Sequence, residues 1–112
     1  MLEKWLDPDE SVVMEEKAFI WTKTKFNING TWAIVYLTNK RFYAKDRIVR
    51  MKLANIPFSN IKELKSTDKH LVITGRDKGK DTLYEIKIRL KDIDDMWEPW
   101  IRGRLEGVRS LN

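Results

Sequence analysis

The chain has 112 residues, which fits one domain, and 42% of them are hydrophobic, which is enough for one compact core. It contains no cysteine, which excludes disulfides, a thiol nucleophile and a zinc–thiolate site. The net charge of +5 favours anionic partners, although 17 acidic residues among 22 basic ones predict a mostly mixed surface.

The N-terminal segment is acidic and has no apolar run, so it does not read as a signal peptide. No stretch approaches the roughly 20 apolar residues of a membrane-spanning helix. We therefore expect a soluble, cytoplasmic protein that forms a single domain over residues 1–112.

The first elements in chain order are a short lead-in and a long strand. Residues 2–6 are expected to be helical or irregular, and Pro8 ends them. Residues 11–24 are expected to form the first strand, because Phe19, Ile20 and Trp21 favour β-structure. A helix over residues 10–17 is the alternative, and the polar run at 15–17 indicates a bulge or bend.

Six more strands are expected. Residues 27–30 are expected to form the first turn, because Asn29-Gly30 is a strong hairpin-turn signal in which both residues tolerate positive φ. Polar turns follow at 38–40, 46–47 and 59–61. The expected strands between these turns and beyond them are residues 31–38, 41–45, 49–58, 62–65, 71–75 and 83–90.

After residue 91 the apolar period changes to three and four residues, which predicts an amphipathic helix. Asp92 is its expected N-cap. Pro99 indicates either a kink or a short turn before a main helix that begins close to it. The apolar face consists of Ile93, Trp97, Trp100, Ile101, Leu105 and Val108.

Residues 30–45 (GTWAIVYLTNKRFYAK) and 55–65 (NIPFSNIKELK) resemble the core of GRAM and bacterial pleckstrin-homology (PH-like) domains. The resemblance extends over almost the whole chain, including the acidic lead-in. It implies a mainly β (α+β) fold, a seven-stranded antiparallel barrel or sandwich capped by one C-terminal α-helix. It also implies a binding or assembly module, since bacterial PH-like domains form homo-oligomers.

No residue pattern points to catalysis or to a cofactor or metal. His70 is the only histidine, and Asp92, Asp94 and Asp95 are expected to be the charged start of the helix. Residues 75–80 superficially resemble a phosphate loop, but they lack the final Ser or Thr and lie between two strands. We expect a polar hairpin loop there, and a protein that is not an enzyme.

One basic segment is a candidate site for an anionic ligand. Two strands and their turns would gather its cations, which are Lys40, Arg41, Lys45, Arg47, Arg50 and Lys52. They would suit phospholipid headgroups or nucleic acid, of which we expect nucleic acid to be an unlikely partner. The alternative is a solvated outer face of the sheet. Phosphoinositide-binding PH domains carry their basic motif on the first strand and its loop, where this chain offers only Lys23 and Lys25.

The strand at 31–38 is apolar on both faces. If Ala33, Val35 and Leu37 point inward, together with Phe42 and Ala44, an outer stripe remains. This candidate protein interface consists of Trp32, Ile34, Tyr36 and Tyr43. The alternatives are a reversed register and an N-terminal segment that folds over the stripe through Trp5.

The function expected from the sequence is therefore protein–protein contact, with a homo-oligomer as one form of it. The second expectation is a peripheral membrane module that binds anionic phospholipid headgroups through the basic segment.

Overall fold

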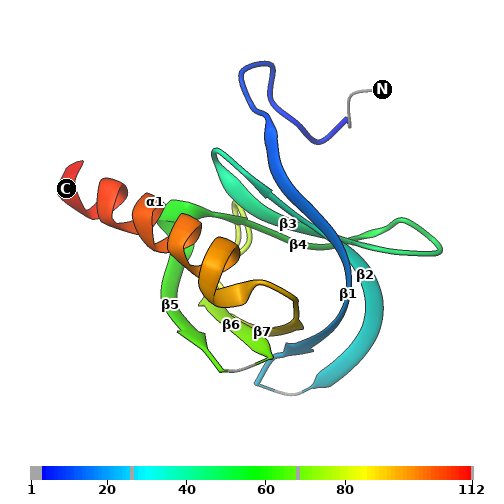
Figure 1. The fold of residues 1–112 in the computed structure, drawn as a ribbon. Helices are drawn as coiled ribbons and strands as arrows, with labels where there is room; N and C mark the ends of the chain where they lie inside the picture. The colour runs from blue at the N-terminus through cyan, green and yellow to red at the C-terminus, as the bar shows by residue number, and fades with distance from the viewer. Residues whose placement is uncertain (1–3, 26, 68, 112) are drawn as a thin grey trace.

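Seven antiparallel strands form one curled sheet in the computed structural model, which describes residues 4–25, 27–67 and 69–111 (Figure 1). Their order across the sheet is β4-β3-β2-β1-β7-β6-β5. The strands are β1 (Val12–Lys23), β2 (Ile28–Thr38), β3 (Arg41–Asp46), β4 (Lys52–Pro57), β5 (Ile61–Ser66), β6 (His70–Gly75) and β7 (Tyr84–Arg89). The expected mainly β fold of seven antiparallel strands with one C-terminal helix is confirmed.

The inner face of the curl is the core, and β2 has the first of the two registers that the sequence left open, not the reversed one. Ala33, Val35 and Leu37 are buried, as are Phe42 and Ala44 on β3, with which Leu37 and Val35 pair. The side chains of a strand alternate between its two faces, so Trp32, Ile34 and Tyr36 lie on the outer face of the sheet.

The first strand is unbroken, and the alternative of a helix over residues 10–17 is wrong. β1 pairs with β2 along its whole length, from Val12 opposite Thr38 to Lys23 opposite Ile28. The polar run had suggested a bulge at residues 15–17. The register shift lies instead between Val12 and Met14. The regular pairing of those residues shows that a polar run need not disturb a strand.

The predicted hairpin turn at Asn29-Gly30 is wrong, because both residues belong to β2. The turn lies earlier, where the amide of Thr24 donates to the carbonyl of Asn27 at 2.8 Å. Gly30 serves another purpose: a Cβ there would stand 2.8 Å from the ring of Phe19 on β1. Glycine is needed to admit an aromatic ring across the strands, not to permit a turn.

The two edges of the sheet are joined by a short 3-10 helix and a loop. The helix η1 (Phe58–Asn60) links β4 to β5. The segment after β6 runs beside it, with the amide of Arg76 donating to Asn60 O (3.2 Å) and that of Lys78 to Asn55 O (2.8 Å). Asp77 accepts hydrogen bonds from the Asn55 amide and the Tyr84 hydroxyl. The phosphate-loop-like residues 75–80 thus connect two strands, as expected, and close the curl against β4.

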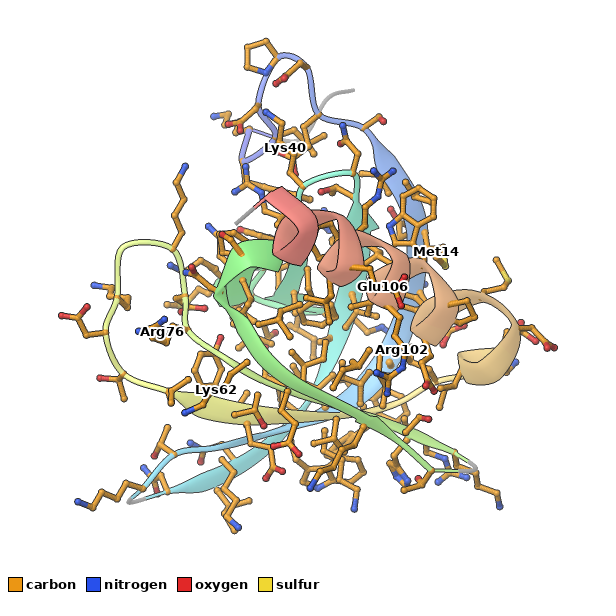
Figure 2. All side chains as sticks on the ribbon, turned by 90° about the vertical axis from the view of Figure 1, so that its left-hand side faces the viewer. Met14, Lys40, Lys62, Arg76, Arg102 and Glu106 are labelled. Atoms are coloured by element: carbon orange, nitrogen blue, oxygen red, sulfur yellow. The ribbon has the colours of Figure 1, made fainter. Side chains whose placement is uncertain are left out.

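The C-terminal helix covers one end of the curl (Figures 1 and 2). A single π-helical turn, η2 (Ile93–Trp97), precedes α1 (Glu98–Leu111), so Pro99 stands at the start of α1. The expected short turn before the main helix is confirmed. Four residues of the expected apolar face are buried: Ile93, Trp97, Ile101 and Leu105. Trp100 is half-buried, and the side chain of Val108 lies outside those that the structure describes.

Polar contacts fix α1 on the sheet. Glu98 accepts a hydrogen bond from the hydroxyl of Ser66, and Arg102 donates to the carbonyl of Leu64 at 3.1 Å. Asp92 occupies the N-cap position of η2, as predicted, but its φ of 53° is left-handed and its side chain makes no capping hydrogen bond. In the described part of the chain, no helix combines the length and apolar character needed to cross a membrane.

Gly75→Ala and Gly103→Ala form a matched pair that tests how the curl closes. A Cβ at Gly75 would lie 2.8 Å from the carbonyl oxygen of Asn60, which is backbone and cannot swing aside. We expect Gly75→Ala to lower the free energy of unfolding by about 1–3 kcal/mol. Gly103 on α1 has open space around it, so Gly103→Ala should raise that free energy by about 0.5–1 kcal/mol. Urea denaturation measures both, and a Gly75→Ala protein as stable as wild type would contradict the close approach.

Candidate functional site

The six cations of the basic segment do not form one patch. Lys40, Arg41 and Lys45 are engaged in contacts that hold the fold together. Arg47, Arg50 and Lys52 lie at the turn between β3 and β4 and are exposed. The structure therefore divides the six cations of the candidate anionic-ligand site into three with partners inside the protein and three that are exposed at a turn.

Arg41 is buried in an ion pair with Glu10, which lies directly before β1. Its Nε donates to Glu10 Oε2 at 2.9 Å and its Nη2 to Oε1 at 2.7 Å, so the pair is bidentate. The hydroxyl of Thr38 donates to the same carboxylate at 2.6 Å, and the amide of Asp7 donates at 3.0 Å. The Arg41 guanidinium is thus buried against internal partners and is unavailable to a ligand.

Lys40 and Lys45 also have internal contacts. Lys40 Nζ lies 2.6 Å from Asp9 and 3.4 Å from Asp7, beside the loop that precedes β1 (Figure 2). Lys45 is buried, with its Nζ 5.4 Å from the ring centroid of Tyr36. Both lysines therefore help to hold the N-terminal segment and the outer face of β2–β3.

The N-terminal segment covers half of the candidate protein interface. The Trp5 ring stacks on Tyr43 with centroids 3.9 Å apart and an interplanar angle of 2°, and it lies 5.2 Å from Tyr36. Both tyrosines are buried as a result. They lie on the outer face, as expected, but under Trp5, which was the alternative that the sequence left open. Trp32 and Ile34 remain outside this cover, and Trp32 is 54% exposed.

The turn between β3 and β4 combines exposed apolar side chains with cations. We call residues 47–52 the hairpin tip. Ile48, Val49 and Met51 are 84, 64 and 68% exposed, and they are interspersed with Arg47, Arg50 and Lys52. The tip projects to the right in Figure 1, on the side away from α1. The structure thus presents an apolar surface bordered by positive charge.

Asp46 holds the hairpin tip in a defined shape. Its Oδ1 accepts the amides of Ile48 (2.8 Å) and Val49 (3.0 Å), and Thr31 donates to its Oδ2. The hydrogen bonds from these two amides lower the pKa of Asp46 below its ordinary value, so the carboxylate is ionised at neutral pH. The Asp46 amide donates to Met51 O at 2.8 Å. The amides of Ile48 and Val49 thus have internal acceptors, while the apolar side chains of the tip lie outside.

The apolar half of this site does not follow from the sequence expectations. Residues 49–58 were expected to form a strand, whereas β4 begins only at Lys52. Because Val49 was assigned to that strand, its exposure was not foreseen. The usable signal was the mixture of basic and apolar residues directly after Asp46, a residue type whose side chain accepts hydrogen bonds from the amides of the next turn.

Comparison with known proteins adds no family to these observations. The chain matches no protein-family model, and a search of curated proteins finds no significant relative. Among the described residues, no group of three or more His, Cys, Asp or Glu side chains is placed to hold a metal ion.

The Glu10–Arg41 pair predicts acid sensitivity. Burial alone would raise the pKa of Glu10, but hydrogen bonds from Arg41, the Asp7 amide and Thr38 outweigh it and hold that pKa below its ordinary value of 4.5. A lowered folded-state pKa stabilises the fold above the unfolded-state value, and this stability is lost as pH falls through the folded-state pKa. Thermal unfolding of the wild type should therefore shift to lower temperature below about pH 4.5.

Glu10→Gln should be less stable at pH 7, by about 3–5 kcal/mol, because Arg41 loses its buried counter-charge. The free energy of unfolding of Glu10→Gln should also fall less steeply than that of the wild type as the pH is lowered below about 4.5. Glu15→Gln removes an exposed carboxylate on β1 and is the control. If both variants followed the wild-type pH profile, Glu10 would not be the source of the acid sensitivity.

Proposed function

We propose that this chain is a non-enzymatic PH-like module that attaches to anionic membrane surfaces through the hairpin tip. The observation that supports it is the tip itself, where three exposed apolar side chains are interspersed with three cations. The seven-stranded curl with its C-terminal helix is compatible with the PH-like architecture that the sequence resembles.

Two free-energy terms favour the membrane surface at this tip. Each Lys or Arg near an anionic leaflet contributes roughly 1 kcal/mol, and this contribution falls as salt screens it. An aliphatic side chain that leaves water gains roughly 1.5–3 kcal/mol when completely buried, so shallow insertion gains part of that. Neither term alone is large, and the tip combines them.

The geometry of the tip also limits the cost of insertion. Backbone amides that enter an apolar region without partners are unfavourable. The amides of Ile48 and Val49 already donate to Asp46, and Arg47 N donates to Trp32 O at 3.1 Å. Trp32 at the base of the tip is a residue type enriched at membrane–water interfaces.

The function expected first from the sequence, protein contact through the stripe on β2 and β3, has less support. Two of its four residues, Tyr36 and Tyr43, are covered by Trp5. A stripe reduced to Trp32 and Ile34 is small for a stable interface. The stripe could contact a partner over its full length only if Trp5 moved away, whereas the hairpin tip is already exposed.

Vesicle sedimentation with two tip variants tests this function. One variant carries Ile48→Ser, Val49→Ser and Met51→Ser, and the other Arg47→Glu, Arg50→Glu and Lys52→Glu. We expect the wild type to bind vesicles of phosphatidylcholine with phosphatidylserine, and not phosphatidylcholine alone. Each variant should bind at least tenfold more weakly. Residual binding of the serine variant should disappear between low and physiological salt, because only screened charge remains.

Ile28→Ser is the matched control for the serine variant, because Ile28 is an exposed aliphatic residue at the other hairpin, between β1 and β2. Lys62→Glu on β5 is the control for charge. Both controls should sediment with the vesicles as the wild type does. Equal binding of neutral and anionic vesicles, or undiminished binding by both tip variants, would refute the proposed function.

A further inference from the structure

A groove with a volume of about 380 Å³ opens where β1 separates from β7. The two strands pair only from Ile20 opposite Ile88 to Lys23 opposite Glu85. Beyond Ile20 the chain after β7 leaves the sheet toward η2, and the groove lies between it and β1. Its lining is Glu16, Lys17, Ala18, Phe19, Trp32, Lys69, Arg89, Leu90 and Lys91.

One wall of the groove is an open strand edge. Within the described residues, Val12–Phe19 pairs with β2 on one side and has no strand neighbour on the other. Alternate residues of an antiparallel strand turn both their N–H and their C=O to the same side, so part of this backbone faces the open edge. Such an edge is a template for an added strand.

The side chains around this edge set the charge of the segment that it would accept. Four exposed cations line the groove, on β1, before β6, and at and after the end of β7: Lys17, Lys69, Arg89 and Lys91. The carboxylate in the groove, Glu16, already accepts the Lys91 amide at 3.2 Å. With four cations and one carboxylate in its lining, the groove carries a net positive charge.

The groove also has an apolar contact surface. The rings of Phe19 and Trp32 meet edge to face, with centroids 5.3 Å apart and an interplanar angle of 86°. Trp32 is half-exposed and Phe19 is partly so. Aromatic residues of this kind supply much of the binding energy at protein interfaces.

We propose that this groove binds an extended, acidic peptide segment of a partner protein, which adds as a strand to the open edge of β1. The main chain of the segment pairs with β1, its carboxylates meet the four cations, and its apolar side chains pack on Phe19 and Trp32. This surface adjoins the hairpin tip at Trp32, but none of the tip residues 47–52 lines the groove, so the inference does not depend on the membrane function.

Charge distinguishes the acidic peptide from other occupants. A second copy that paired through the same edge would bring the same four cations together, which disfavours a symmetric dimer. A single-stranded nucleic acid needs exposed ring faces on which bases stack. Here Phe19 and Trp32 turn edges and faces toward each other, and the open backbone edge has no role in nucleic-acid binding.

Binding of a designed peptide to the full chain tests the inference. The probe is a capped peptide in which Glu and Val alternate over about eight residues, a length that matches the open edge at roughly 3.3 Å per residue. A peptide with Lys in place of Glu is its control. We expect a change in tryptophan fluorescence, and protection from hydrogen exchange at alternate amides of Val12–Phe19, with the acidic peptide alone.

Arg89→Glu with Lys91→Glu should weaken this binding at least tenfold. Lys62→Glu with Lys78→Glu makes the same change of net charge away from the groove and should leave the affinity unchanged. N-methylation of alternate peptide bonds keeps the charge but removes main-chain donors, so it should also abolish binding. Circular dichroism verifies that each variant is folded.

Three results would overturn the inference. Equal affinity for the N-methylated peptide would show that charge, and not strand addition, holds the segment. Equal losses in both double variants would show that the groove has no special role. Tighter binding of oligothymidylate than of the acidic peptide, lost in the Arg89→Glu, Lys91→Glu variant, would assign the groove to nucleic acid.

Discussion

The buried ion pair between Glu10 and Arg41 determines which parts of this surface can meet a partner. It ties the segment before β1 to β3, and Trp5 then lies over Tyr36 and Tyr43. A buried ion pair is not in itself a large source of stability, because desolvation offsets most of the attraction. Its effect is specificity: an ionised Glu10 has one place where its charge is satisfied, and that place fixes the path of the N-terminal segment.

Side chains are therefore packed on both faces of the sheet at β2 and β3. The core lies on the inner face, the tyrosines on the outer face, and Trp5 over them. This layering ends at Asp46, beyond which the hairpin tip has no cover. Trp32 lies at the boundary between the covered face and the uncovered tip. Its carbonyl accepts a hydrogen bond from the Arg47 amide, and its ring contacts Phe19 in the groove. A membrane surface and a peptide partner would meet this domain at neighbouring positions.

Much of the fold could be predicted because it follows from alternation along single strands. Alternation limited β2 to two registers, since Ala33, Val35 and Leu37 can face the core only together, and the structure shows that they do. The turn at Asn29-Gly30 could not be excluded in this way. Gly30 is there because of the Phe19 ring on the neighbouring strand, a contact that no local pattern reveals.

The candidate site was predicted only in part, for a similar reason. Six cations could be read from the sequence, but whether each one has an internal partner depends on residues some thirty positions away, as for Arg41 with Glu10 and Lys40 with Asp9. The groove along β1 was missed altogether. It exists because the pairing of β7 with β1 stops at Ile20, whereas β1 extends on to Val12. The relative lengths of two strands far apart in the chain are not encoded locally.

The conformation of Arg50 has a consequence for how this hairpin can change. Its φ of 61° is left-handed, a region in which side chains with a Cβ are unfavourable and glycine is at ease. Glycine at this position would relieve the backbone but remove a cation from the tip. Stability and surface charge thus pull this one position in opposite directions, and selection for a more stable hairpin would also make it less basic.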